Sequence, residues 1–168
     1  RNDAALREKE GLEQTKGFAI GSGDGHVIIT ENGIKYDVDY ISGQKTGFFL
    51  DQKYNRQAVA RIARGKRVLD MFTHTGAFGL NCAAAGAAKV TSVDISADAL
   101  TSAAKNAALN GLEVEYVQAD IFELLTKMAE ERCRDYDCII LDPPAFTKSG
   151  ATLKNAVRGY KEINMKAM

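Results

Sequence analysis

Residues 68–76 read Val-Leu-Asp-Met-Phe-Thr-His-Thr-Gly, and an alanine-rich segment at 77–85 follows them directly. The apolar run predicts a short strand at 68–72, and the alanine-rich segment predicts a helix. Between them lies a turn with a single glycine, Gly76. A strand, a tight turn and a helix in this order are the first half of a βαβ unit.

The same alternation continues toward the C-terminus. Three more apolar runs predict strands at 89–94, 114–118 and 138–141. Helices are expected between them at 96–110, with Ser96 as N-cap and Asn110-Gly111 as its end, and at 121–132. Strands that alternate with helices of this length indicate a parallel sheet.

Toward the N-terminus the pattern changes. Residues 1–16 are charged and predict a short exposed helix. The runs 26–30 and 34–40 flank Glu31-Asn32-Gly33, and Asn-Gly between two such runs predicts a β-hairpin. An extended segment is expected at 44–51, and a helix with an apolar stripe at 52–63.

The predicted fold is therefore α/β: a Rossmann-like, doubly wound parallel sheet, truncated, preceded by a small β-hairpin element. We expect residues 1–64 to form the helix and hairpin element and 65–168 to form the sheet domain, incomplete at its C-terminus. The core of a sheet covered on both faces consists of apolar strand residues. Here these are Val68, Leu69, Val90, Val93, Val117, Ile139 and Ile140.

The composition is that of an ordinary globular domain, with 45% hydrophobic and 26% charged residues in a chain of 168. No apolar run reaches the roughly 20 residues of a membrane helix, and no signal peptide is visible. Three scattered cysteines exclude a disulfide framework and a zinc site, and predict a reducing, cytoplasmic setting. Because the chain lacks an initiating Met and stops inside a helical pattern, we expect both ends to be cut.

The net charge is zero, but its distribution is uneven. Segment 44–67 has seven basic residues and one acidic, 94–137 has four basic and ten acidic, and 146–168 has five basic and one acidic. Cationic stretches on either side of an acidic one suit a polyanion such as RNA. The alternative interpretation is an ordinary set of solvated faces.

Acidic residues follow each predicted strand of the sheet. Parallel sheets bind ligands at the carboxyl ends of their strands, so four such acids in succession predict one binding cleft there. Asp94 lies 18 residues after Gly76, close to the roughly 20 that separate a glycine loop from a ribose-binding acid. The four acids are Asp70, Asp94, Asp120 and Asp142.

The loop after the first strand favours S-adenosylmethionine over a nicotinamide dinucleotide. It is not G-x-G-x-x-G, the loop that lets a backbone approach a pyrophosphate. S-adenosylmethionine carries a sulfonium and an amino-acid tail, and an acid such as Asp70 suits the ammonium of that tail. A dehydrogenase is therefore the less favoured alternative.

With these residues in view, the sequence resembles the class I methyltransferases, and more closely the bacterial family that methylates carbon 5 of a cytosine in large-subunit ribosomal RNA. The blocks at 43–52 and 158–164 are specific to that family, whereas the loop and the acids mark only the superfamily. The blocks that carry the likeness are 7–13, 43–52 with Asn55-Arg56, 72–78, 142–146 and 158–164.

The resemblance implies the roles of the site residues. The loop would hold the methionine part of the cofactor, Asp94 with Ile95 the ribose, and Asp120 with Ile121 the adenine. Asp142, with Pro143, would lie between the cofactor and the target base as the catalytic acid. Gln52 and Arg56 would close over the site. The loop residues in this set are Asp70, Phe72, Thr73, Thr75 and Gly76.

Methylation of carbon 5 also implies a cysteine nucleophile, which the family places beyond Met168. Cys82, Cys133 and Cys138 are better explained as packing or surface residues. Ala145 follows Asp-Pro-Pro where amino-group methyltransferases place an aromatic residue, so attack on an exocyclic amine is disfavoured. Two alternatives stay open: a guanine-N7 ribosomal RNA methyltransferase, and a non-catalytic RNA-binding module that retains the cofactor fold.

Overall fold

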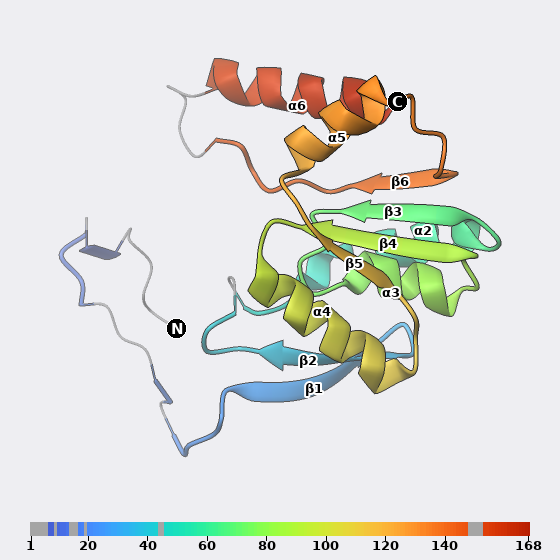
Figure 1. The fold of residues 1–168 in the computed structure, drawn as a ribbon. Helices are drawn as coiled ribbons and strands as arrows, with labels where there is room; N and C mark the ends of the chain where they lie inside the picture. Colours follow the sequence, from blue (N-terminus) through green and yellow to red (C-terminus); the bar gives the residue numbers. More distant parts are fainter. Residues whose placement is uncertain (1–6, 9, 14–16, 19, 44–45, 148–152) are drawn as a thin grey trace.

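The computed structural model describes residues 7–8, 10–13, 17–18, 20–43, 46–147 and 153–168. Its centre is a parallel sheet of four strands in the order β5-β4-β3-β6 (Figure 1). These strands are β3 (Arg67–Met71), β4 (Lys89–Asp94), β5 (Glu115–Gln118) and β6 (Cys138–Leu141). Because β3 lies between β4 and β6, the strand order reverses there, as in doubly wound folds.

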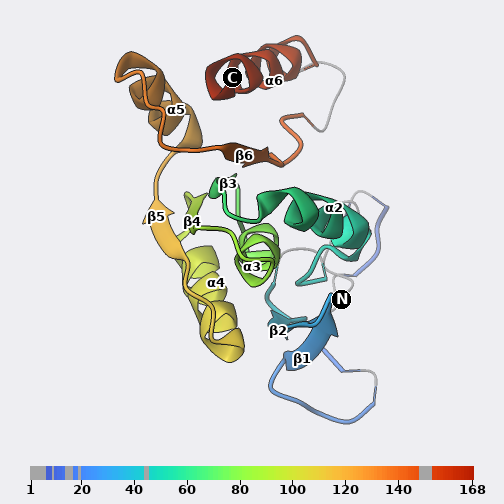
Figure 2. The same cartoon turned by 90° about the vertical axis from the view of Figure 1, so that its right-hand side faces the viewer.

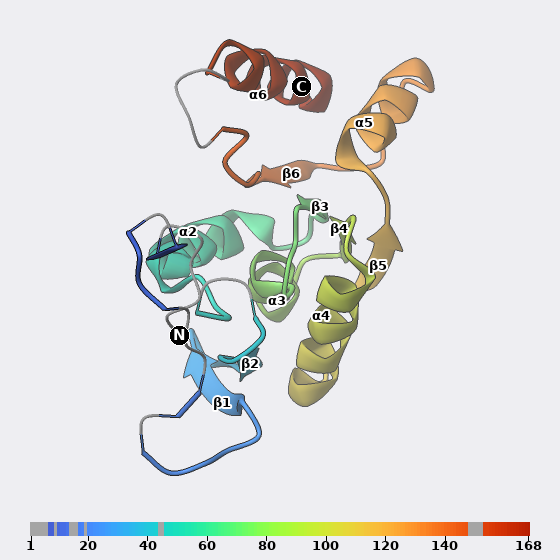
Figure 3. The same ribbon diagram turned by 90° about the vertical axis from the view of Figure 1, so that its left-hand side faces the viewer.

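Helices cover both faces of the sheet, which confirms the predicted fold class. On one face lie α2 (Lys53–Ala63), α3 (Ala77–Ala84) and α4 (Ala97–Asn110), and on the other lie α5 (Ile121–Glu130) and α6 (Leu153–Ala167) (Figure 3). Successive residues of β3 point to opposite faces. Val68 packs with Ala63 and Cys82, whereas Leu69 and Met71 pack with α5 and α6.

The predicted core is confirmed at the centre of the sheet. Val68, Leu69, Val90, Val93 and Ile140 are all buried. Val117 and Ile139 are only partly buried, because β5 and β6 are the outer strands of the sheet in the described part of the chain. Central strands are covered on both faces and along both edges, and outer strands are not.

The hairpin is present where the sequence predicted it. β1 (His26–Glu31) pairs antiparallel with β2 (Ile34–Asp39), and Asn32 and Gly33 form the turn at φ 54° and 80°. Positive φ at both central residues is the type I′ geometry that Asn-Gly favours. The hairpin lies beside α3 and α4 (Figure 2). The buried side chains of β2, among them Tyr36, pack on these two helices.

Helix ends also follow the sequence. The Ser96 hydroxyl accepts a hydrogen bond from the Ala99 amide at 3.2 Å and begins α4 as an N-cap. Gly111, at φ 61°, ends the same helix in the left-handed conformation. No helix among the described residues combines the length and the apolar character needed to cross a bilayer.

Two expectations near the N-terminus differ from the structure. The extended segment expected at 44–51 is wrong: residues 46–49 turn and Leu50–Gln52 is a short 3-10 helix, η1. The reason is Gly47, at φ 84°, where a Cβ would lie 2.3 Å from the Asp39 carbonyl oxygen. Of the helix expected at 1–16, Arg7 and Glu8 are helical and a turn follows at Glu10; its other residues are mostly outside the described part.

Candidate active site

The carboxyl ends of the four parallel strands lie along one edge of the sheet. The segments that leave this edge hold most of the predicted site residues, and Asp70 and Asp94 lie in the last residues of their strands. The switch point lies between β3 and β6, so the loop after β3 faces the segment after β6 there. These segments begin at Phe72, Ile95, Ala119 and Asp142.

The loop at 72–76 has an unusual backbone. Phe72, His74 and Gly76 have φ values of 60°, 52° and 82°. Positive φ in residues other than glycine is uncommon and persists only where surrounding contacts hold it. Here the Thr73 amide donates to the Val93 carbonyl at 3.0 Å, and the Gly76 amide donates to the Thr73 carbonyl at 2.9 Å.

Asp70 lies beneath this loop and is 1% exposed. Its Oδ2 accepts hydrogen bonds from Thr73 Oγ1 at 2.5 Å, the Gly79 amide at 2.9 Å and Ser92 Oγ at 3.4 Å. Burial raises its pKa to about 6, although the three hydrogen bonds oppose the shift. The carboxylate thus holds the loop from below, and a contact between Asp70 and the cofactor's ammonium stays a prediction.

Gly79 is a site residue that the sequence did not reveal. A Cβ at this position would lie 2.5 Å from Ser92 Oγ and 3.1 Å from Asp70 Oδ2. The glycine thus lets the first turn of α3 approach Asp70 closely enough for its amide to donate. The signal in the sequence was a glycine within a predicted helix, which often marks close packing.

Asp94 is partly buried at the end of β4. Its Oδ2 accepts from the His74 amide at 2.9 Å and its Oδ1 from the Ser96 amide at 3.0 Å. An ionised carboxylate has about four acceptor directions, so it can still accept from ligand hydroxyls. Ile95 beside it is 63% exposed and offers an apolar surface.

Asp120 and Ile121 lie where β5 gives way to α5. Asp120 is the N-cap of α5, because its Oδ1 accepts from the amides of Phe122 at 2.8 Å and Glu123 at 3.2 Å. Ile121 is 3% exposed and packs in the core beside Leu69. Its side chain is thus turned away from the cleft, and only its main chain remains for a contact with a ligand.

The structure brings Gln52 and Asp142 together. Gln52 Nε2 donates to Asp142 Oδ2 at 3.1 Å, and Asn55 Nδ2 donates to Gln52 Oε1 at 2.6 Å. A hollow of about 340 Å³ between α2 and β6 includes all three residues. The pKa of Asp142 is raised, first by its removal from water and then by Asp51, against the effect of Arg56.

Arg56, which the sequence predicted to close over this site, lies buried between α2 and the hairpin, and its role toward a ligand stays a prediction. The guanidinium is buried and pairs with Glu31, with Nε 2.8 Å from Oε1. It also donates to the Phe49 carbonyl at 2.6 Å and lies 4.7 Å from the centroid of the Phe48 ring. Arg56 therefore joins α2 to the hairpin.

Aromatic rings fix the segment that follows Asp142-Pro143. The Phe146 ring lies between Phe122 and Tyr160, with centroid distances of 5.7 and 4.4 Å. Tyr160 Oη accepts from the Phe146 amide at 3.3 Å and donates to the Pro144 carbonyl at 3.4 Å. Phe122 and Tyr160 are thus positioning residues that sequence reasoning missed.

His74 and the cysteines take no catalytic position. The His74 ring lies against Phe49 at 5.3 Å, and burial lowers its pKa. Cys82 faces the sheet from α3, and burial raises its pKa to about 12. Cys138 pairs with Val68 at the amino end of the sheet, and Cys133 precedes β6.

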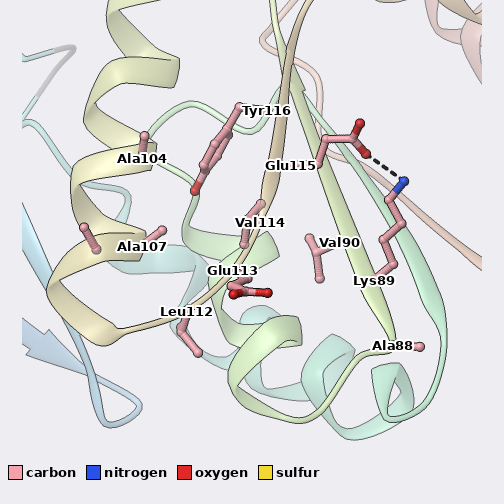
Figure 4. A pocket seen from close by; sticks show the side chains of 11 residues that line it. Ala88, Lys89, Val90, Ala104, Ala107, Leu112, Glu113, Val114, Glu115 and Tyr116 are labelled. Carbon is pink, nitrogen blue, oxygen red and sulfur yellow. Dashed lines mark ion pairs between the residues drawn. The ribbon is translucent and has the colours of Figure 1, made fainter.

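A larger hollow of about 610 Å³ lies elsewhere, between α4 and β5 (Figure 4). It includes the ion pair of Lys89 and Glu115, at 2.9 Å. Both residues begin their strands, so this hollow opens at the amino end of the sheet. Ligands of such folds bind at the carboxyl end, and the candidate site is therefore the smaller crevice with its adjoining loops.

Known proteins are similar to this chain in sequence and in fold. The sequence profile of a family described as S-adenosylmethionine-dependent methyltransferase matches residues 15–165. The chain is 48% identical over its whole length to ribosomal RNA large subunit methyltransferase I of Photobacterium profundum, and 46% identical over 99% to the protein of that name from Aeromonas salmonicida. It covers 43% of each, so the chain spans less than half the length of these relatives.

Solved structures of similar fold are also described as methyltransferases. A crystal structure of a protein described as a methyltransferase, complexed with SAH, superposes with a TM-score of 0.71 at 30% identity, over 87% of this chain and 41% of the other. A SAM-dependent methyltransferase from Agrobacterium tumefaciens gives 0.70 at 28%, over 77% and 43%. The chain belongs to the S-adenosylmethionine-dependent methyltransferase family.

Proposed function

We propose that this chain is the cofactor-binding part of a cytoplasmic enzyme that methylates large-subunit ribosomal RNA, at carbon 5 of a cytosine. The observation that carries the proposal is the meeting of the 72–76 loop, Asp94 and the Asp142–Gln52 pair at the carboxyl edge of the sheet. The names of the relatives that match the full chain support ribosomal RNA as the substrate.

The residues present fit S-adenosylmethionine. Asp94 retains acceptor directions for the two ribose hydroxyls, and exposed Ile95 offers an apolar surface beside it. The 72–76 loop contains no lysine or arginine that would favour a pyrophosphate. When bound, S-adenosylmethionine supplies an electrophilic methyl group, and the carboxylates around the cleft favour its positive charge.

Asp142 has the position of a residue that contacts the base. It follows the outer strand β6, and the amide of Gln52, the N-cap of α2, orients its carboxylate. Tyr160 holds the following prolines from α6. Because partial burial and then the charge of Asp51 raise the pKa of Asp142, this acid is better suited to exchange a proton with a base than an ordinary surface aspartate is.

The two elements that position Asp142 also carry exposed cationic side chains. They are Lys53 and Arg61 on α2, and Lys154, Arg158 and Lys161 on α6. A polyanion that crosses the carboxyl edge between these helices would meet positive charge on both sides. This distribution supports RNA rather than a small molecule as the methyl acceptor.

Carbon 5 of cytosine is supported by Ala145, since amino-group methyltransferases place an aromatic residue there. The nucleophile for carbon 6 would come from outside residues 1–168, because Cys82, Cys133 and Cys138 lie away from the carboxyl edge.

Two measurements test the proposal. Calorimetry of this chain with S-adenosylmethionine and with NAD should show binding of the first only. A longer protein that contains this chain should then transfer label from S-adenosylmethionine to 23S ribosomal RNA, with mass spectrometry placing it on cytosine carbon 5. A methyl group on guanine N7 would refute the cytosine assignment. Cofactor binding without any transfer to RNA would favour a non-catalytic module.

A further inference from the structure

Three buried or partly buried asparagines of α3 and α4 hold the hairpin. Asn81 Nδ2 donates to Tyr36 Oη at 2.9 Å. Asn110 accepts from the Lys35 amide at 2.8 Å and donates to the Lys35 carbonyl at 2.7 Å. Asn106 accepts from the Asp37 amide at 2.8 Å. Since β1 pairs along one edge of β2, the helix amides satisfy backbone groups on its other edge.

Asn106 differs from the other two in a second contact. Its Nδ2 donates to the Thr75 carbonyl at 3.1 Å, and the side chain is fully buried. One amide group therefore bridges the backbone of β2 and the 72–76 loop. Asn110, one turn further along α4, bonds Lys35 and the Asn106 carbonyl instead.

We infer that Asn106 is a positioning residue for the cofactor loop, and that it links the conformation of this loop to the seating of the hairpin. The inference rests on the proposed function of 72–76 as part of the cofactor site. Thr75 lies between His74 and Gly76, both of which have positive φ, so its carbonyl orientation depends on outside contacts. The Thr73 and His74 amides tie the loop to β4 of the sheet, at Val93 and Asp94. Asn106 of α4, which also bonds the hairpin, adds a further hydrogen bond to the loop at the Thr75 carbonyl.

The chemistry of the amide makes the inference testable. Asparagine offers an acceptor to Asp37 and a donor to Thr75, and aspartate of the same shape offers only acceptors. Asn106→Asp therefore keeps the hairpin bond, removes the loop bond and turns an oxygen toward the Thr75 carbonyl. Asn110→Asp is the matched control: it keeps the bond from the Lys35 amide, loses the bonds that Nδ2 donates to the Lys35 and Asn106 carbonyls, and leaves the loop untouched.

The experiment measures SAH binding by calorimetry and amide hydrogen exchange in both variants of this chain. Asn106→Asp should weaken binding roughly tenfold, the loss that removal of one hydrogen bond produces, and Asn110→Asp by less than about twofold. Exchange at the amides of Thr73, His74 and Gly76 should rise in Asn106→Asp alone. If a buried charge prevents folding, Asn106→Ala and Asn110→Ala give the same comparison with the same expected result.

Equal effects of the two substitutions on affinity and loop exchange would refute the inference, because both would then act through the hairpin alone. Unchanged affinity in a folded Asn106→Asp would also refute it. Failure of the unmodified chain to bind SAH would count against the proposed function instead. The exchange comparison would still decide whether Asn106 holds the loop.

Discussion

Asp94 and Asp70 end neighbouring strands on the same side of the sheet, but their carboxylates have different surroundings. Asp94 is partly exposed and directs both oxygens to the cleft and the loop amides. Asp70 is covered, and one of its oxygens receives three hydrogen bonds. We therefore expect a ligand-binding role for the first and a structural role for the second.

Substitution Asp94→Ala should weaken the binding of S-adenosylmethionine by roughly ten- to a hundredfold, because charge-assisted hydrogen bonds to hydroxyls are each worth about 1.5–3 kcal/mol. Calorimetry measures the affinity, and circular dichroism checks the fold. Asp98→Ala, an exposed acid one turn into α4, is the control and should leave affinity unchanged. Wild-type affinity in folded Asp94→Ala would exclude Asp94 from the site.

Asp70 should make stability depend on pH. Its pKa in the folded chain is about 6, above the ordinary value of 3.8, so the folded state holds this proton more tightly than the unfolded state. Its stabilising contribution is present below about pH 4 and is lost as pH rises through 6. Two pKa units correspond to about 3 kcal/mol.

Asp70→Asn should remove this dependence, because an amide oxygen accepts the same bonds without ionising. Urea unfolding of both proteins from pH 4 to pH 7 measures it: the free energy of unfolding of the unmodified chain should fall relative to that of the variant. Parallel profiles would show that Asp70 ionises with an ordinary pKa.

At this scale the sequence predicted where the acids lie but not which way each faces. Spacing after a strand fixes the edge of the sheet, and all four acids are there. The surroundings of Asp70 depend on Ser92, its partner in the pairing of β3 with β4, and on Gly79, which reaches it through the packing of α3 on the sheet. These contacts join residues of different elements, so the sequence around Asp70 does not predict them.

At the scale of elements, the hairpin is joined to α2 by the buried pair of Arg56 and Glu31. Removal of one partner leaves the other charge buried, so Arg56→Ala should lower the free energy of unfolding by about 3–5 kcal/mol. Arg61→Ala, an exposed position on the same helix, should change it by less than about 0.5 kcal/mol.

The double substitution Arg56→Met with Glu31→Leu should lose less stability than Arg56→Ala alone, since no unpaired charge remains. Urea unfolding of the four proteins gives these differences. A double variant that is less stable than Arg56→Ala would mean that the pair contributes attraction beyond the cost of its burial.

Most elements were predicted to within a few residues because their periodicity and caps are local signals. The 46–52 segment was not, since its turn depends on Gly47 packing against Asp39 of β2. The pairing of Arg56 with Glu31 was not predicted for a related reason: Glu31 is 25 residues away and belongs to another element.

For the whole molecule, the hairpin and the sheet domain share one hydrophobic cluster. Tyr36 and Phe48 pack with Leu80 and Ala107, from the two helices that cover one face of the sheet. The fold class could be predicted because alternation of strands and helices determines it. The docking of the hairpin could not, because it depends on side chains such as Asn106 that resemble surface residues of a helix.

The position of the cysteines leads to a prediction for the whole enzyme. A thiolate that adds to carbon 6 of a cytosine must lie at the carboxyl edge, beside Asp142. Cys138 begins β6 and thus lies at the opposite edge, Cys133 precedes it, and burial raises the pKa of Cys82 to about 12. None of these thiols lies beside Asp142, and burial leaves Cys82 without the acidity of a nucleophile.

This chain alone should therefore bind S-adenosylmethionine but transfer no methyl group to ribosomal RNA. In a longer, active protein that contains it, alanine at Cys133 or Cys138 should leave turnover within about twofold. Cys133 precedes β6, and Cys138 lines the hollow beside α2 but lies at the opposite end of β6 from Asp142. Cys82→Ala should lower stability by about 1 kcal/mol through loss of buried volume, but not turnover of the folded protein.

Asp142→Asn should reduce kcat more than cofactor affinity, because its proposed partner is the base in the transition state. Methyl incorporation from labelled S-adenosylmethionine measures all of these, and robust turnover by residues 1–168 alone would overturn the argument.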